Sequence, residues 1–210
     1  MSTLPLQLEH IYWIGGGSAA GKSTIARRIA AAHGLRVYST DDAMVDHARR
    51  SSASDCPLLH HFMGMDLDER WVNRKPHIML ETFHWFRGEG FNFIIEDLLR
   101  LPREPAVIAE GFRLLPQFVK LLATPNRAVW LLPTPDFRQA VVDSRGGPAW
   151  SFLAKTSNPQ KALHNLLERD RLFTDVLREA TARLALPVIE VDSTTGEDDL
   201  ARRVINLFEL

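Results

Sequence analysis

Residues 16–23 read Gly-Gly-Ser-Ala-Ala-Gly-Lys-Ser and match the pattern G-x-x-x-x-G-K-[ST] in full. Glycines let a backbone wrap closely around an anion, because they accept a positive φ and lack a Cβ. The successive amides of such a turn form an anion-binding nest, and a helix that begins there adds its unpaired N–H groups and its dipole. The stretch therefore predicts a phosphate-binding loop.

The residues on both sides give this loop the context it needs. A short apolar strand, Ile11 to Ile14, precedes it, and an alanine-rich helix, Lys22 to His33, follows it and ends at Gly34. A glycine-rich turn with an unrelated lysine is the alternative, but it would need several residues to coincide at fixed spacing. We therefore interpret the loop as a P-loop that binds ATP and Mg²⁺. The predicted nucleotide-binding residues are Gly16, Gly17, Ser18, Ala19, Ala20, Gly21, Lys22, Ser23 and Thr24.

Strand-like and helical segments alternate along the rest of the 210 residues. The strand-like segments are short and continuously apolar, which is typical of strands buried on both faces of a parallel sheet. Helices between them would complete right-handed crossovers. We expect one α/β domain over residues 1–210, with a doubly wound, five-stranded parallel sheet. After Ile11–Ile14, the predicted strands are Leu35–Ser39, Ala106–Ala109, Ala128–Leu132 and Pro187–Val191, and a helix over Glu197–Phe208 follows the last.

Two stretches do not belong to this minimal pattern. Residues 43–104 form a long insertion, for which we expect two helices, near Asp68–Arg87 and over Phe91–Leu101. We interpret it as a helical acceptor-binding insertion. Residues 145–158 carry the pair Gly146-Gly147 and are interpreted as a lid. Behind this lid a long helix is expected, with Asn158 as its cap and Pro159 at its first position.

Carboxylates follow the second and third predicted strands. Asp41 and Asp42 end the second strand and Glu110 ends the third, so all three are expected beyond the carboxyl edge of the sheet, beside the P-loop. Glu110 has the placement of a Mg²⁺-binding acid, together with Ser23 and Asp41. Asp41 or Asp42 could accept a proton from an acceptor hydroxyl. The alternative for Asp41 or Asp42 is the N-cap of the next helix, and an exposed strand end is the alternative for Glu110.

These motifs together carry a resemblance to a known family. The P-loop, the run Ser39-Thr40-Asp41-Asp42, the run Glu110-Gly111-Phe112 and Asp136-Phe137-Arg138 resemble the P-loop small-molecule kinases of the nucleoside-monophosphate-kinase-like group. Within it they are most similar to the uridine kinase and nicotinamide riboside kinase branch. The resemblance covers residues 11–42 and 106–210, and the insertion matches no pattern. It implies the strand order 2-3-1-4-5, an acceptor site over Asp41 as the base, and an arginine-bearing lid.

Arginines and aromatic residues supply the remaining candidates. Positive charge on the oxygens of the transferring group is the main source of catalysis in phosphoryl transfer. We predict Lys22, Asp41 and Arg145 as catalytic. Arg138 and Arg169 are predicted to bind the nucleotide, and Arg171 is a further lid candidate. The insertion is rich in aromatic and basic residues, most of which we expect to be the buried face of an amphipathic helix. The predicted acceptor-binding residues are Asp41, Asp42, Arg74, His84 and Arg113.

The favoured function is an ATP-dependent kinase that transfers the γ-phosphate to a hydroxyl of a small molecule, with a nucleoside, a metabolite and an antibiotic all open as acceptors. A regulatory P-loop ATPase or nucleotide switch and a polynucleotide 5′-hydroxyl kinase are the alternatives. The formal net charge of −1 argues against nucleic acid as the partner. No apolar run is long enough to predict a membrane span, and residues 1–15 do not resemble a signal peptide. With one cysteine, Cys56, we expect a cytoplasmic protein, and a homodimer is left open.

Overall fold

The computed structural model describes residues 4–210. Residues 1–3 lie outside the described residues. They belong to the expected domain and to the segment 1–15, which was compared above with a signal peptide. Five parallel strands form one sheet in the order β2-β3-β1-β4-β5, so the expected doubly wound α/β fold and its strand order are confirmed. The strands are β1 (Ile11–Gly16), β2 (Arg36–Ser39), β3 (Val107–Glu110), β4 (Ala128–Pro133) and β5 (Val188–Val191).

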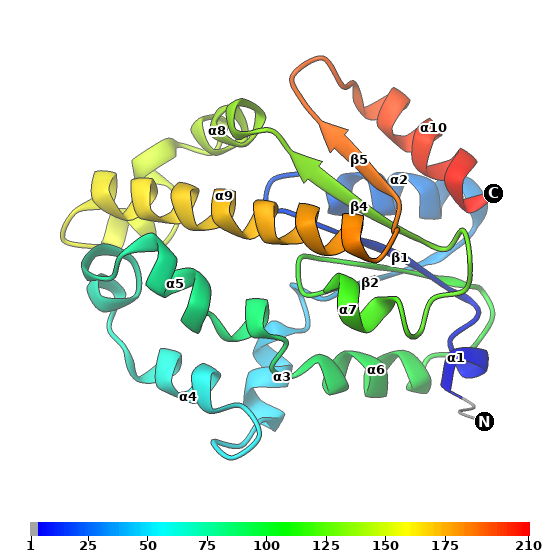
Figure 1. The fold of residues 1–210 in the computed structure, drawn as a ribbon, viewed down its shortest axis with the longest axis horizontal. Helices are drawn as coiled ribbons and strands as arrows, with labels where there is room; N and C mark the ends of the chain where they lie inside the picture. Colours follow the sequence, from blue (N-terminus) through cyan, green and yellow to red (C-terminus); the bar gives the residue numbers. More distant parts are fainter. Residues whose placement is uncertain (1–3) are drawn as a thin grey trace.

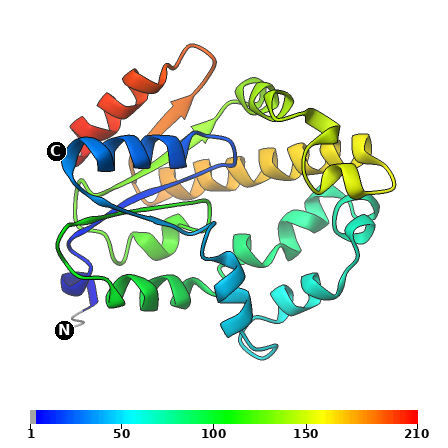
Figure 2. The same ribbon diagram turned by 180° about the vertical axis from the view of Figure 1, so that it is seen from behind.

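Helices cover both faces of the sheet. Figures 1 and 2 show α2 (Lys22–His33) and α10 (Glu197–Phe208) on one face. The opposite face carries α6 (Phe91–Arg100), α7 (Pro116–Val119) and the long helix α9 (Pro159–Arg183), which crosses in front of the sheet in Figure 1. The sheet is therefore the middle layer of three, as a doubly wound fold requires.

Each face of the sheet contributes to its own hydrophobic core. Tyr12 and Ile14 pack with the side chains of α2 and α10. Ile11 and Trp13, the alternate residues of β1, pack into the other core with α6, α7 and α9. Because successive side chains of a strand point to opposite faces, both sets must be apolar when both faces are covered. This explains why the predicted strands were continuous apolar runs.

Two predicted helix ends are confirmed. Helix α2 begins at Lys22 and ends at Gly34, whose φ of 65° is left-handed and whose N–H donates to the carbonyl of Ala30. Such a conformation suits a glycine. Helix α9 begins at Pro159, and the side-chain oxygen of Asn158 accepts from the N–H of Lys161 at 3.0 Å. The expected cap therefore satisfies one of the free amides at the helix start.

The insertion is helical, but one of its expected helices is wrong. The helix over Phe91–Leu101 is confirmed as α6, whereas the single helix near Asp68–Arg87 is replaced by three short pieces. Pro76 explains the break, because a proline disfavours a helical conformation of the preceding residue, and Lys75 is extended with ψ 148°. The pieces are a π-helical turn η1 (Glu69–Asn73), α5 (Pro76–Thr82) and a 3₁₀ turn η2 (His84–Arg87). Two unpredicted helices precede them, α3 (Met44–Arg50) and α4 (Pro57–Gly64).

Part of the insertion and the predicted lid lie at one end of the molecule. In Figure 1, α4, α5 and the lid segment are on the left, beyond the carboxyl ends of β4 and β5, whereas α6 runs below the sheet and both termini lie on the right. The lid segment follows α8 (Pro135–Ser144) and contains two 3₁₀ turns, η3 (Gly147–Ala149) and η4 (Leu153–Lys155). Ligands of open parallel sheets usually bind beyond the carboxyl ends of the strands, and this is the end at which α4, α5 and the lid segment lie. The other end of the molecule carries the short helix α1 (Leu4–Gln7).

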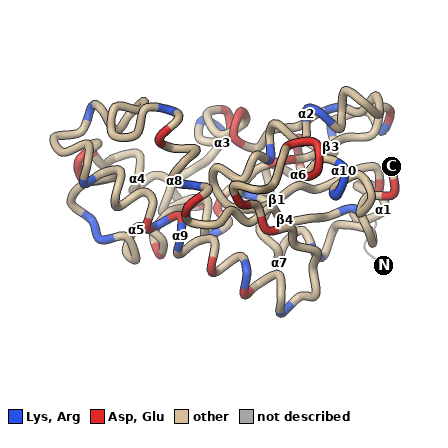
Figure 3. Tube along the Cα trace, turned by 90° about the horizontal axis from the view of Figure 1, so that it is seen from above, with Lys and Arg blue, Asp and Glu red and all other residues tan. Residues whose placement is uncertain are grey.

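Charged residues are mixed over the surface. Basic and acidic positions are interspersed over the helices in Figure 3. Among residues 4–210 the structure contains no helix with the length and apolarity that a membrane crossing would need.

Candidate active site

The P-loop connects the end of β1 to the start of α2, and two of its glycines are required by the backbone. Gly16 has φ 133°, and a Cβ on it would lie 2.0 Å from the carbonyl oxygen of Leu131 on β4. Gly21 has φ 76° and faces open space, in which a Cβ would meet nothing within 4 Å. Gly16 therefore allows the loop to approach the sheet, and Gly21 gives the loop the turn that directs its amides to the start of α2.

Lys22 lies at the centre of the loop. Its side chain is buried, and Nζ donates to the carbonyl of Gly17 at 2.7 Å. Burial lowers the pKa of the Lys22 ammonium, while the negative charges of Asp41, Glu110 and Asp170 oppose that shift. Three carboxylates from three different elements are therefore close enough to act on this one cation.

Ser23 and Glu110 form a pair suited to a magnesium ion. The hydroxyl of Ser23 donates to Oε1 of Glu110 at 3.0 Å, and Oε2 of Glu110 has no hydrogen-bond partner among the described residues. Glu110 is only 1% exposed, and burial raises the pKa of its carboxyl, although Lys22 opposes the shift. A buried carboxylate with a free oxygen, next to a hydroxyl, fits a hard cation that prefers oxygen ligands.

The described residues contain no group of three or more His, Cys, Asp or Glu side chains that could hold a metal by themselves. Magnesium does not need one, because it usually binds through one or two protein oxygens together with substrate phosphates and water. The pair of Ser23 and Glu110, with Asp41 nearby, is therefore sufficient to fit the ion.

Asp41 follows β2 and is not a helix cap. Helix α3 begins at Met44, and its N-cap position is Ala43, with no side-chain capping bond. The capping alternative for Asp41 is therefore wrong. The hydroxyl of Thr40 donates weakly to Oδ1 of Asp41 at 3.4 Å, and burial raises the pKa of the Asp41 carboxyl despite the charge of Lys22.

Asp42 has a different environment from Asp41. Its side chain is exposed, and its backbone N–H donates to the hydroxyl of Ser39 at 3.3 Å. Asp41, but not Asp42, lines the cavity that contains the P-loop. Of the two acids that the sequence left open as the base, Asp41 is the one that the fold directs to the loop.

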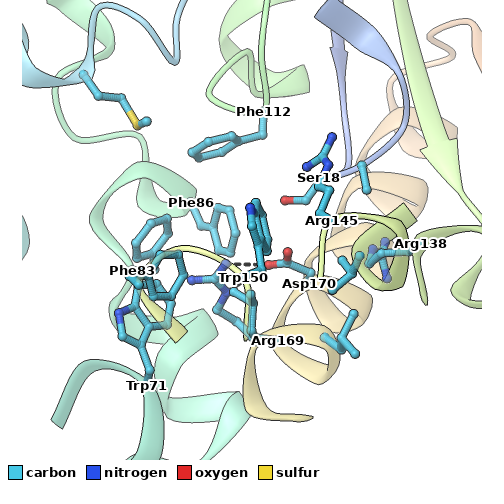
Figure 4. Close-up of a pocket in the computed structure, with 16 residues that line it drawn as sticks. Ser18, Trp71, Phe83, Phe86, Phe112, Arg138, Arg145, Trp150, Arg169 and Asp170 are labelled. Atoms are coloured by element: carbon cyan, nitrogen blue, oxygen red, sulfur yellow. Dashed lines mark hydrogen bonds and ion pairs between the residues drawn. The ribbon is translucent and has the colours of Figure 1, made fainter. Parts of the chain in front are cut away.

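Two adjoining cavities occupy the carboxyl end of the sheet. The first, here called the P-loop cavity, has a volume of about 330 Å³ and is lined by Ser18 to Thr24, Asp41, Phe112, Arg145 and Trp150. The second, here called the aromatic cavity, has a volume of about 300 Å³ and lies between α9, the insertion and the lid segment (Figure 4). Both cavities are lined by Ser18, Ala19, Phe112, Arg145 and Trp150, so they meet along a common border.

Aromatic rings make up most of the wall of the second cavity, and a buried ion pair lies among them. Nε and Nη2 of Arg169 donate to Oδ1 of Asp170 at 2.9 and 2.6 Å, and both residues are buried. Figure 4 shows this pair beside Trp150, with Phe83, Phe86 and Trp71 on the side of the insertion. The ring-bearing residues of the wall are Trp71, Phe83, Phe86, Phe112, Trp150 and Phe152.

The four predicted lid arginines have different environments. Arg138 is buried in α8, donates to the hydroxyl of Thr174 and lines the aromatic cavity. Arg145 borders both cavities, and its guanidinium lies 5.3 Å from the ring centre of Trp150. Arg169 is the member of the ion pair described above. Arg171 lines neither cavity and pairs with acids of its own helix, Glu168 at 2.7 Å and Asp175 at 2.8 Å.

Two of the residues predicted to bind the acceptor point elsewhere. Arg74 donates to the carbonyl of Glu69 and to the hydroxyl of Thr82, so it links η1 to α5. His84 is buried against the rings of Phe62 and Trp85, and burial together with the neighbouring arginines lowers its pKa to about 3. Neither residue lines the two cavities, and these contacts assign them to the packing of the insertion.

Arg113, the third of these residues, is buried next to the segment that bears Asp41. Its guanidinium lies 3.9 Å from the ring centre of Trp85, and burial lowers its pKa to about 10. It donates to the carbonyls of Thr40 and Gly90, both at 3.2 Å. Arg113 therefore connects the segment that bears Asp41 to the insertion, and it does not line either cavity.

The sequence interpretation did not include Asp170, Trp150 and Phe152 among the site residues. A signal for Asp170 exists, because it falls within the apolar stripe of α9, where Leu163, Leu166, Phe173 and Leu177 are all buried. A charged residue in such a stripe must be paired or must serve a ligand. The lid aromatics carry no such periodic signal.

No family model matches the sequence, and no curated protein does. Solved structures with a similar fold include an uncharacterized protein from Eubacterium ventriosum ATCC 27560, at 14% identity and a TM-score of 0.49 over 95% of this chain and 97% of that one. A gluconokinase from Sinorhizobium meliloti 1021 matches at 16% identity and a TM-score of 0.46, over 96% and 92%. A shikimate kinase from Acinetobacter baumannii in complex with shikimate matches at 18% identity and a TM-score of 0.42. The match covers 95% of this chain and 92% of that one. At this level the likeness concerns the fold alone, and it does not show the uridine kinase branch.

Proposed function

We propose that this protein is an ATP- and Mg²⁺-dependent kinase that transfers the γ-phosphate to a hydroxyl of a small molecule. The observation that carries the proposal is the border shared by the P-loop cavity and the aromatic cavity. A switch or a regulatory ATPase uses water as the acceptor and has no need for a second cavity beside the phosphate site. A kinase needs a separate place for its acceptor, next to the transferring phosphate.

The residues of the P-loop cavity would have complementary roles. The loop amides and Lys22 would bind the phosphates. Ser23, together with Glu110 beside the cavity and Asp41 nearby, would hold Mg²⁺. When bound, the ion neutralises part of the negative charge on the β and γ phosphates. Arg145 adds positive charge from the lid segment, where the γ-phosphate would face the second cavity.

Asp41 would act on the acceptor. It lines the P-loop cavity, and its carboxylate would orient the acceptor hydroxyl and take its proton as the oxygen bonds to phosphorus. Burial raises the pKa of Asp41, which makes its carboxylate a better proton acceptor than an exposed one. Arg138 lies near Lys22 and would serve the nucleotide, as the sequence predicted.

The segment 145–158 would act as the lid. Arg145 and Trp150 come from this segment and border both cavities, so its movement would open and close them together. Closure over the reacting groups excludes water and limits wasteful hydrolysis. We also retain a cytoplasmic location as a proposal, with Cys56 free and buried.

The test compares ADP formation from ATP and Mg²⁺ with and without a panel of candidate acceptors, with mass spectrometry to identify the phosphorylated product. We expect ADP formation to depend on the acceptor, and Lys22→Ala to reduce it by at least about 10², the usual effect of removing one preorganised charge. Lys120→Ala is the matched control, because Lys120 is exposed at the opposite end of α7 from the site. ADP formation that is independent of every acceptor would indicate a regulatory ATPase. Salt-dependent binding to single strands, with 5′ phosphorylation, would indicate a polynucleotide kinase.

A further inference from the structure

The proposed kinase function leaves the acceptor open, and the aromatic cavity narrows it. We propose that the acceptor is a largely apolar, ring-bearing alcohol with one oxygen group that accepts hydrogen bonds, and not a polyol or a phosphate ester. This inference rests on the proposed function for the transfer step, but the binding preference of the cavity stands on the cavity itself.

The wall offers a preformed apolar surface. Eleven of the sixteen lining residues are apolar, and six of these carry rings. Within the wall, the rings of Phe83 and Phe86 meet edge to face at 4.7 Å, and Phe86 stacks in parallel at 3.6 Å on Phe173, which is not part of the lining. Rings fixed in this way favour a ligand body with apolar faces, because no side chain must be reordered on binding.

The polar groups of the cavity are few, and most are donors. The five polar lining residues are Ser18, Arg138, Arg145, Arg169 and Asp170, of which three are arginines. Asp170 is the only carboxylate in the lining, and its Oδ1 already accepts two hydrogen bonds from Arg169. Every hydroxyl of a polyol needs an acceptor for its proton when it leaves water, and an unpaired buried hydroxyl weakens binding. The cavity therefore disfavours polyols.

Arg169 offers a polar contact that a ligand can complete. The residue is 5% exposed, and its Nη1 has no hydrogen-bond partner within the described part of the chain. Its guanidinium carbon lies 4.7 to 5.1 Å from the centres of three rings, those of Phe83, Trp71 and Phe86. A carbonyl or carboxylate oxygen on a ring placed against this wall would satisfy the free N–H groups.

The charge of the cavity wall favours a neutral or singly charged oxygen group over the doubly charged group of a phosphate ester. Asp170 already balances the charge of Arg169, so a group with two negative charges at this position would remain largely uncompensated in a buried site. The other two arginines of the lining, Arg145 and Arg138, are assigned above to the transferring phosphate and to the nucleotide, so they already face negative charge. One neutral or singly charged oxygen group is therefore the most that the acceptor end of the cavity accommodates.

The test measures binding by calorimetry to the full chain saturated with ADP and Mg²⁺, so that adenosine and AMP do not report on the nucleotide site, and then phosphate transfer with ATP and Mg²⁺. The probes are 2-naphthalenemethanol and its 6-carboxylate as ring alcohols, gluconate and adenosine as polyhydroxylated compounds, and AMP as the phosphate ester. We expect both ring alcohols to bind at least about tenfold more tightly than the other three, the effect of one unpaired buried polar group. Gluconate, adenosine or AMP binding more tightly than both ring alcohols overturns the inference.

Variants separate the contribution of Arg169 from that of the rings. Arg169→Lys keeps the charge beside Asp170 but lacks the free Nη1, so we expect about tenfold weaker binding of the carboxylate and unchanged binding of 2-naphthalenemethanol. Equal binding of the carboxylate by both proteins overturns the role of Arg169. If this buried variant does not fold, Trp150→Leu in the lid segment tests the wall, and we expect weaker binding of both ring alcohols with unchanged binding of gluconate. Unchanged binding of the ring alcohols by that variant contradicts the inference.

The two proposals fail in different ways. Tight binding of the ring alcohols with no transfer of phosphate to any probe supports the inference about the cavity and contradicts the kinase function. Phosphorylation of gluconate or adenosine in preference to the ring alcohols supports the kinase function and overturns the inference.

Discussion

Asp41 and Asp42 are adjacent in the chain, yet only Asp41 lines the P-loop cavity. In the proposed mechanism Asp41 orients the acceptor hydroxyl, so Asp41→Asn should reduce phosphate transfer by a factor on the order of 10² to 10⁴. ATP affinity should change much less, because the loop amides and Lys22 supply most phosphate contacts. The two quantities are measured separately, as product formation and as nucleotide binding. Asp42→Asn is the matched control, and transfer by Asp41→Asn at the rate of this control would remove Asp41 from the mechanism.

The ionised carboxylate of Asp41 should also lower the free energy of unfolding at neutral pH. Burial raises the folded-state pKa of Asp41 above its unfolded value, so the ionised carboxylate costs free energy in the native protein at neutral pH. Burial thus outweighs the attraction of Lys22. Asp41→Asn should therefore raise the thermal midpoint at pH 7, and the gain should shrink as the pH falls through the raised pKa, because the native carboxyl is then protonated.

Thermal unfolding of the two variants at pH 7 and at mildly acidic pH checks this prediction. For a domain of this size, each kcal/mol corresponds to a shift of about 2–4 °C. Asp42→Asn should shift the midpoint little, because the side chain is exposed. A midpoint for Asp41→Asn below that of the parent protein at pH 7 would show that the carboxylate stabilises the fold, contrary to this account.

At the scale of elements, the segment 145–158 is the part whose movement matters most. Gly146 and Gly147 have φ values of 107° and 51°, and they lie between α8 and the turn that carries Trp150. The positive φ values suit glycine, and a glycine pair can absorb the backbone changes of a hinge. We expect slower amide hydrogen exchange in 145–158 when a nonhydrolysable ATP analogue and Mg²⁺ are added.

Helix α10 is the internal control for this measurement, because it lies on the far face of the sheet (Figure 2) and lines neither cavity. Its exchange should not change when the nucleotide is added. Exchange in 145–158 that is the same with and without the nucleotide would argue against a lid in this segment.

At the scale of the whole molecule, ligand binding should couple the sheet to the segments at its carboxyl end. Residues that would hold the nucleotide come from β2, β3, α2 and the lid segment, so ATP and Mg²⁺ should stabilise the native fold as a unit. At a concentration of 100 times Kd the expected gain is about 2.7 kcal/mol. This corresponds to a rise of roughly 5–11 °C in the thermal midpoint. The readout is thermal unfolding with ATP and Mg²⁺ and with ATP in the presence of a chelator.

Lys22→Ala should lose most of this rise, whereas Lys120→Ala should keep it. A rise of equal size in both variants would mean that the nucleotide binds elsewhere on the molecule.

The local patterns of the sequence were sufficient for the central part of the fold. The pattern of residues 16–23, the apolar runs and the caps at Gly34 and Asn158 predicted the sheet and the ends of α2 and α9, because each depends on residues close together in the chain. The resemblance of short motifs implied the strand order, which the structure confirms. The spacing of aromatic residues near 68–87 predicted one helix, whereas Pro76 breaks it, so the insertion is the least well predicted part.

Only the tertiary structure decided which residues face a ligand. Arg74, His84 and Arg113 had the right chemistry for an acceptor. The packing of the insertion directs Arg74 and His84 to a carbonyl and a ring inside it, and Arg113 donates to the carbonyls of Thr40 and Gly90. Trp150 and Asp170 had no motif, and they reach the same cavity because the lid segment and α9 lie side by side. Short motifs determine local backbone conformation, whereas the direction of a side chain depends on contacts between segments far apart in the chain. For this reason the sequence by itself predicted the phosphate-binding loop and its conformation, and only the fold assembled the aromatic cavity beside it.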